Sequence, residues 1–222
     1  SWSSAMHETG HALYQQGLPA KYSGTALGEP VGMAVHESQS RIWENQIGRS
    51  RAFWKFWETR YRELFPGQLA NVDSEALFLA INRVALTPIR VDADEVTYNL
   101  HIMLRFELEK QLISGELDPA NLPEAWNTRS TEILGYTPKN NREGCLQDVH
   151  WAEGMFGYFP SYCLGNLLAA QLWYTIKDQL PDLETSIAQG DMQPLLQWLR
   201  ENVHALGRQY YTGEFTKYVT GT

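Results

Sequence analysis

Residues 1–17, SWSSAMHETGHALYQQG, place two histidines within a pattern of apolar and polar residues that repeats at helical spacing. We predict a helix over residues 3–16, which ends where Gly17 follows. His7 and His11 stand four residues apart, so their rings project from one face of this helix. Both rings can therefore turn a nitrogen toward a single ion.

Glu8 follows the first histidine and lies close to such an ion without having to bind it. Zinc hydrolases use three protein ligands and keep a fourth position for water, whose proton a neighbouring carboxylate can accept. The HExxH pattern supplies two of these ligands and the base. We therefore predict that His7 and His11 bind a divalent metal and that Glu8 is the general base.

A structural interpretation of the same pattern is that the histidines flank a buried seam and bond backbone carbonyl groups. The residues around the motif are largely apolar, namely Ala5, Met6, Ala12, Leu13 and Tyr14. A purely structural helix would thus bury the imidazole rings beside a glutamate. Burying an unpaired carboxylate costs several kcal/mol, which favours a cation nearby.

The bulk composition is that of a globular protein, with 222 residues, 43% of them hydrophobic and 20% charged. The net charge of −8, without any run of Lys and Arg, argues against a nucleic-acid partner. Cys145 and Cys163 are too few for a disulfide framework, so we expect a cytoplasmic protein. No apolar stretch reaches the roughly 18 residues of a membrane span, so we expect no membrane partner.

Helical signals recur along the rest of the chain, and alternating strand patterns are scarce. We predict further helices over residues 36–48, 50–67, 73–86, 94–114, 123–135, 147–156, 163–180 and 194–207. An apolar stripe on the helix over 94–114 should contain Val96, Leu100, Leu104 and Leu108. The GMAV stretch at 32–35 could form a short edge strand. The predicted class is all-α with at most a small β ribbon, and no domain boundary is evident.

Two histidines do not complete a hydrolytic zinc site, and a glutamate on a following helix is a common third ligand. Glu37 and Glu44 are both candidates, because they lie seven residues apart and so share one helical face. The spacing alone does not choose between them. His36, next to Glu37, should point away from that face and serve a structural or supporting role.

Ordered motifs continue from Ser4 to about Asn166: HETGH at 7–11, HESQSRIWEN at 36–45, IRVDAD at 89–94, GCLQDVHW at 144–151 and GYFPSYCLGN at 157–166. In this order the chain resembles the carboxypeptidase Taq family of metallocarboxypeptidases. The resemblance implies a mostly helical fold around a long groove, shared in outline with neurolysin-like and angiotensin-converting-type peptidases. It also implies a divalent metal, zinc or cobalt, and a homodimer that removes single residues from the carboxyl end of peptides.

Carried over residue by residue, the resemblance makes His7, His11 and Glu37 the metal ligands and Glu8 the catalytic base. The family also has a DxRxT motif ahead of HExxH, which these residues lack. We therefore expect residues 1–222 to be a single catalytic, C-terminal portion of a longer metallocarboxypeptidase.

Arg90 resembles the arginine of the family's IRxxAD motif, which is thought to hold the terminal carboxylate of the substrate. An arginine gives a planar, bidentate match to a carboxylate. From the spacing alone, a structural ion pair with Asp92 or Asp94 is the alternative.

His150 precedes Tyr158 and Tyr162 by eight and twelve residues. Neutral donors aimed at a carbonyl oxygen stabilise the negative charge that grows there during attack by water. We predict this role for all three residues, with core packing as the alternative. Asp148 could orient a histidine or cap a helix.

The favoured interpretation is a metal-dependent carboxypeptidase that acts on peptides. Two other hypotheses fit the same motifs. One is an endo-acting zinc oligopeptidase, and the other is a truncated metal-binding half without activity of its own.

Overall fold

The computed structural model describes all residues from Ser1 to Thr222, and every regular element in it is helical. The predicted all-α class is therefore confirmed, and the β ribbon is absent. No helix combines the length and the apolar composition that crossing a bilayer requires.

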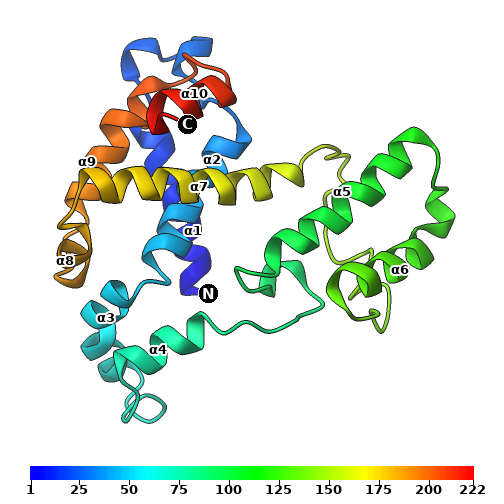
Figure 1. The fold of residues 1–222 in the computed structure, drawn as a ribbon, viewed down its shortest axis with the longest axis horizontal. Helices are drawn as coiled ribbons and strands as arrows, with labels where there is room; N and C mark the ends of the chain where they lie inside the picture. The colour runs from blue at the N-terminus through cyan, green and yellow to red at the C-terminus, as the bar shows by residue number, and fades with distance from the viewer. The chain divides into compact units, whose positions relative to one another are not determined.

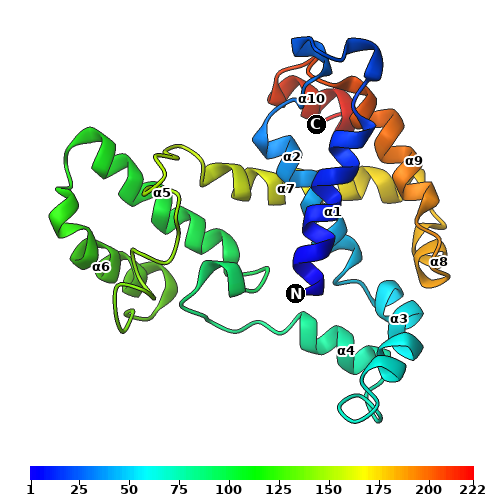
Figure 2. The same ribbon diagram turned by 180° about the vertical axis from the view of Figure 1, so that it is seen from behind.

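Backbone packing divides the chain into two compact units, whose helices are labelled in Figures 1 and 2. Unit 1 comprises Ser1–Ile81 and Leu164–Thr222, and unit 2 comprises Asn82–Cys163. The sequence analysis found no such boundary, since the second junction lies inside one continuous helix, α7 (Pro160–Gln179). The assignment of both units to a single catalytic portion stays a prediction.

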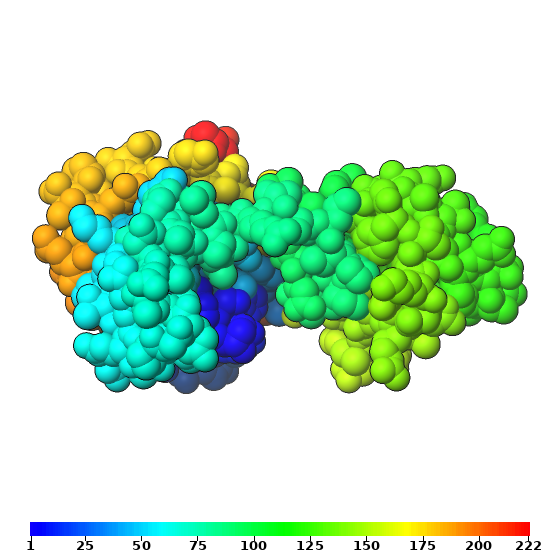
Figure 3. Space-filling view, turned by 90° about the horizontal axis from the view of Figure 1, so that it is seen from below, coloured from blue at the N-terminus to red at the C-terminus, as the bar shows by residue number.

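Unit 1 holds the larger apolar core. Besides most of α7, its helices are α1 (Trp2–Gly17), α2 (Met33–Arg41), α3 (Arg51–Leu64), α4 (Ser74–Ile81), α8 (Leu183–Ala188), α9 (Gln193–Asn202) and α10 (Thr212–Thr220). Short 3-10 turns occur at Ala20–Tyr22, Ala26–Gly28 and His204–Leu206. Fully buried side chains such as Tyr14, Ile42 and Leu172 join these helices in one core. Residues of α3, coloured cyan, form much of the face of unit 1 seen in Figure 3.

Helices α1 and α2 approach each other closely at a glycine. A Cβ atom on Gly10 would lie 2.5 Å from the Cα atom of Ser40, so only glycine fits there. Helix α2 then continues directly into a π-helical turn, η3 (Ile42–Ile47). Such turns are rare and are frequently found at functional sites.

Unit 2 is built on α5 (Tyr98–Ser114) and α6 (Leu122–Leu134), which lie side by side in Figures 1 and 2, with 3-10 turns at Arg90–Asp92 and Pro119–Asn121. Leucines of α5 pack against Trp126 and Leu134 of α6. The neighbouring stripe of α5 is also buried, but it is polar: His101, Arg105 and Glu109 are each at most 5% exposed.

Three local predictions are wrong. The GMAV stretch is no strand, because Gly32 caps α2 and Val35 belongs to the helical core. Residues 147–156 form turns, and a backbone hydrogen bond from Met155 N to His150 O closes one of them. Val96 lies outside the apolar stripe and is 67% exposed, because Asp94 caps the chain there and delays the start of α5 to Tyr98.

The predicted helix over 73–86 is shorter in the structure and ends at Ile81. The carbonyl group of Ile81 accepts a hydrogen bond from Arg49 Nη1 at 3.3 Å. This contact satisfies one of the carbonyl groups that the helix end leaves without an intrahelical partner.

Candidate functional site

The metal cluster, which we define as His7, His11 and Glu37, joins α1 to α2. The Nε2 atoms of the two histidines are 3.2 Å apart. Glu37 Oε2 lies 3.7 Å from His7 Nε2 and 3.5 Å from His11 Nε2. One donor atom from each residue thus falls within 4.8 Å of the other two, which is close enough for one ion to bind all three.

Glu44, the other candidate ligand, lies behind His7. Its Oε2 atom accepts a hydrogen bond from His7 Nδ1 at 2.8 Å, so the helical turn η3 supports the ring from the side opposite Glu37. A carboxylate can only accept at this contact, so the Nδ1 atom of a neutral His7 carries the proton. The Nε2 atom of His7 then presents a lone pair toward the cluster.

Two acceptor atoms of the cluster face each other without a proton between them. Glu37 Oε2 is an acceptor, and the Nε2 atom of a neutral His7 faces it as a second acceptor at 3.7 Å. Two facing acceptors repel, whereas a cation between them would be attracted to both. The donor set, two imidazole nitrogens and one carboxylate, also matches that of catalytic zinc sites. The residues present therefore fit a divalent metal.

Arg41 holds both carboxylates in place from one turn further along. Its Nε atom donates to Glu37 Oε1 at 2.7 Å, and its Nη1 atom donates to Glu44 Oε2 at 3.2 Å. Burial alone would raise the pKa of Glu37, but the hydrogen bond from His11 and the charge of Arg41 lower it overall. Burial alone would also raise the pKa of Glu44, but the hydrogen bond from His7 and the charge of Arg41 lower it overall.

His36 contacts the back of His11, with their Nδ1 atoms 2.6 Å apart. Burial and the proximity of His11 lower the pKa of His36, so it is neutral at neutral pH and can accept from His11. Its position away from the cluster agrees with the supporting role expected from the sequence.

A close helix contact also fixes Glu37. A Cβ atom on Gly165 of α7 would lie 2.4 Å from Glu37 Cγ. Glu37 is only 4% exposed as a result, whereas the side chains of His7 and His11 are 18% and 22% exposed. The cluster is therefore open to solvent at the two histidines of α1, and Glu8, which follows His7 in the chain, is exposed.

A second polar group lies in unit 2, and we call it the arginine cluster: Arg90, Arg105, Asp148, His150 and Tyr162. Arg90 donates from Nε and Nη2 to Asp148 Oδ1, at 3.0 and 2.7 Å. Arg105 donates from Nε to Asp148 Oδ2 at 2.6 Å. Burial alone would raise the pKa of Asp148, but the charges and hydrogen bonds of both arginines lower it overall.

The ion pair of Arg90 therefore has another partner than the sequence suggested. Asp94 accepts hydrogen bonds from Thr97 at the start of α5, and Asp92 is exposed. Asp148 neither caps a helix nor chiefly orients a histidine, since its oxygens are taken by Arg90 and Arg105.

The structure brings His150, Tyr158 and Tyr162 together. His150 Nε2 is 3.0 Å from the hydroxyl group of Tyr162, and the rings of His150 and Tyr158 are 5.4 Å apart. Burial lowers the pKa of His150 although Asp148 works in the opposite direction, so the ring is neutral at neutral pH.

The sequence analysis missed three buried charged residues: Arg41, Arg105 and Glu109. Arg41 lies four residues after Glu37, a spacing typical of a helical ion pair. His101, Arg105 and Glu109 recur every four residues among the leucines of α5, and such a polar stripe within an apolar helix was the available signal.

Comparison with known proteins finds a match over residues 1–222 to the family model of the carboxypeptidase Taq (M32) metallopeptidases. Thermostable carboxypeptidase 1 of Thermus thermophilus is 50% identical over 97% of this chain and 42% of its own length. Carboxypeptidase 1 of Bacillus subtilis is 43% identical over 97% of this chain and 43% of its own.

A crystal structure of an M32 carboxypeptidase from Deinococcus radiodurans is similar in fold. It superposes with a TM-score of 0.94 at 46% identity, over 99% of this chain and 44% of that one. The chain thus spans less than half the length of the relatives it matches.

Proposed function

Because the chain belongs to the carboxypeptidase Taq (M32) family of metallopeptidases, we propose that it supplies the metal centre of a metal-dependent carboxypeptidase. His7, His11 and Glu37 would hold the metal. The observation that carries this proposal is the convergence of their three donor atoms within 4.8 Å. The resemblance to the family points to zinc, or alternatively cobalt, and the donor set suits either ion.

A bound divalent metal supplies a polarised scissile carbonyl group and a water of lowered pKa. The chain's own residues do the rest. Glu8, which is exposed and follows the ligand His7 in α1, takes the proton from the attacking water and passes it to the leaving amine. Glu44 and Arg41 keep the His7 ring and the Glu37 carboxylate oriented.

Arg90 binds the terminal carboxylate of the substrate in this proposal. A guanidinium group has five N–H donors. Three of them engage Asp148 and Tyr98, which leaves one on Nη1 and one on Nη2. A guanidinium group presents N–H donors of neighbouring nitrogens as a fork that a carboxylate can accept in a bidentate manner. Asp148 fixes the orientation of the Arg90 guanidinium group. Specificity for the carboxyl end of a peptide would therefore depend on Asp148 as well as on Arg90.

His150, Tyr158 and Tyr162 act as neutral donors to the oxygen on which negative charge develops. The lowered pKa of His150 supports this role, because a neutral imidazole can donate from one nitrogen without carrying a charge into a buried site. Its contact with the hydroxyl group of Tyr162 keeps the ring oriented.

Further proposals concern the setting of the reaction. The substrates would be peptides of broad sequence, and the protein would act in the cytoplasm as a homodimer. The thiols of Cys145 and Cys163 are both free, which is compatible with a reducing compartment.

The proposal is tested by the metal-to-protein ratio and by cleavage of N-blocked dipeptides. We expect about one equivalent of metal in the wild type, little in Glu37→Ala, and an unchanged ratio in Glu29→Ala, which alters an exposed carboxylate. Cleavage should require a free terminal carboxyl group and stop when that group is amidated. A ratio unaffected by Glu37→Ala would contradict the proposed ligand set, and cleavage of the amidated peptide would indicate an endopeptidase.

A further inference from the structure

Glu109 of α5 is a buried carboxylate that the proposed chemistry leaves unused. It is 5% exposed and holds two groups at once. Its Oε2 atom accepts a hydrogen bond from Trp151 Nε1 at 2.7 Å, and its Oε1 atom accepts one from the backbone N–H of Gly157 at 2.6 Å. Glu109 thus joins two points of one loop to a rigid helix.

Residues 151–157, between those two points, have no helix of their own. Gly154 and Gly157 adopt positive φ angles of 75° and 77°, which turn the chain back on itself. The internal bonds of the loop are short-range, for example from Gly154 N to Trp151 O. Glu109 adds a contact from outside the loop to these internal bonds.

The residues next to the gripped positions are two of the proposed catalytic donors. His150 directly precedes Trp151, and Tyr158 directly follows Gly157. Their rings lie 5.4 Å apart. The hydrogen bonds of Glu109 therefore hold the backbone next to each of these two side chains.

The same helix also holds the start of this loop. Arg105, one turn before Glu109, donates to Asp148 Oδ2. Through Arg105 and Glu109, helix α5 therefore contacts Asp148, just before the loop, and Trp151 and Gly157 at its two ends.

We propose that Glu109 is a positioning residue for peptide hydrolysis, whose carboxylate grips Trp151 and Gly157 and thereby fixes the separation of His150 and Tyr158. The inference rests on the proposed function for its consequence in catalysis. The grip itself can be measured without any activity.

Two variants loosen the grip by different means. Glu109→Gln turns an amide N–H₂ toward one of two N–H donors, so at least one hydrogen bond is lost. Trp151→Phe removes the indole N–H that donates to Glu109. It keeps an aromatic ring in the place that packs against Trp126 and Phe159.

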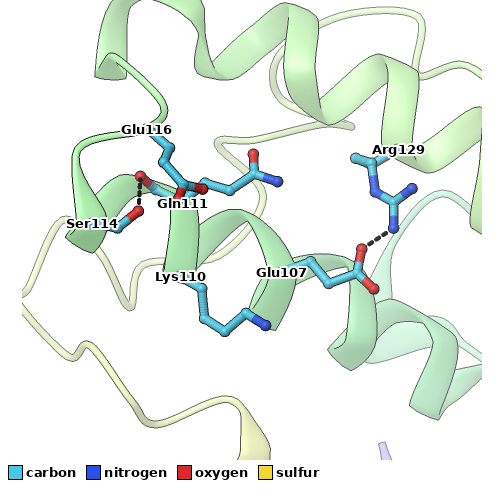
Figure 4. A pocket seen from close by; sticks show the side chains of 6 residues that line it. All are labelled: Glu107, Lys110, Gln111, Ser114, Glu116 and Arg129. Carbon is cyan, nitrogen blue, oxygen red and sulfur yellow. Dashed lines mark hydrogen bonds and ion pairs between the residues drawn. The ribbon is translucent and has the colours of Figure 1, made fainter.

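Glu107→Gln is the matched control on the same helix. Glu107 forms an ion pair with Arg129 beside a polar pocket, as Figure 4 shows, and it makes no hydrogen bond to residues 151–157. The control therefore removes one charged carboxylate from α5 without touching the loop.

The first measurement is the nuclear Overhauser contact between the ring protons of His150 and Tyr158. We expect it in the wild type and in Glu107→Gln, and we expect it to weaken or vanish in Glu109→Gln and Trp151→Phe. The second is the kinetics of the metal-loaded chain on an N-blocked dipeptide. There kcat should fall about a hundredfold in both loop variants, with KM and metal content little changed.

Each outcome decides something. Ring contacts that persist in Trp151→Phe would overturn the inference, and this variant keeps the test open if Glu109→Gln does not fold. Lost contacts with an unchanged kcat would make the grip merely structural and would also overturn it. A wild-type chain that binds metal but hydrolyses nothing would contradict the proposed function, while the ring contacts would still decide whether Glu109 positions His150 and Tyr158.

Discussion

The metal cluster of unit 1 and the arginine cluster of unit 2 are both built from buried charges, but they balance those charges differently. In the metal cluster, the Nε2 atom of His7 and the Oε2 atom of Glu37 face each other as two acceptors. In the arginine cluster, Asp148 already lies between two guanidinium groups. The first arrangement favours a cation from outside, whereas in the second the chain itself supplies an opposite charge.

This difference fits the separate roles that we propose for the metal ligands and for Arg90. A set of converging lone pairs with an open side binds a cation and leaves room for water. An arginine that is held by Asp148 and still has free N–H donors is preorganised for an anion such as a carboxylate. Substitutions that alter one cluster at a time test this difference.

The largest effect is expected from Glu8→Gln in the metal cluster. The substituted side chain cannot take a proton from water, so kcat/KM on an N-blocked dipeptide should fall roughly a hundredfold to ten-thousandfold. Metal content should stay the same, because Glu8 is exposed next to the ligands without being one of them. Loss of metal along with activity would place Glu8 among the ligands instead.

Breaking the arginine cluster should affect stability. Asp148→Asn leaves Arg90 and Arg105 buried without their shared counter-charge, and we expect a loss of about 3–5 kcal/mol in the free energy of unfolding. Urea titration measures this loss. Asp92→Asn, at an exposed position, is the control and should change it by less than about 0.5 kcal/mol. Equal effects of both variants would show that Asp148 is not the centre of the cluster.

The same ion pairs predict a dependence on pH. The pKa of Asp148 is lowered in the folded chain, chiefly by the two arginines acting against burial. Its contribution is therefore complete above the unfolded-state pKa of about 3.9 and is lost as the pH falls toward the folded-state pKa. The gap in unfolding free energy between wild type and Asp148→Asn should be constant from pH 7 to pH 5 and narrow at pH 3. A gap that stays constant at pH 3 would contradict the lowered pKa.

The two clusters also differ in how far the sequence reveals them. Helical periodicity predicts the pair of His7 and His11, because the two residues lie one turn apart on one helix. The resemblance in motif adds Glu37 on the next helix. Spacing does not choose between Glu37 and Glu44, since both share a helical face, and the resemblance to the family favoured Glu37. In unit 2, Asp148 pairs with Arg90 across 58 residues, between segments without periodicity. No spacing rule predicts such a pair, and the closer Asp92 and Asp94 were the expected partners.

The smallest effect is expected from Glu44→Gln, which keeps the shape of the side chain and removes its charge. Its contact with His7 Nδ1 orients a proposed ligand without belonging to the three converging donors. The dissociation constant for zinc should therefore rise about tenfold to a hundredfold, as measured by competition with a chelator. Glu75→Gln is the matched control, because Glu75 also pairs with an arginine of unit 1, Arg51, but on the exposed surface. If both variants bound zinc like the wild type, the orientation of His7 would depend on its helix alone, and the support behind the metal cluster would be structural.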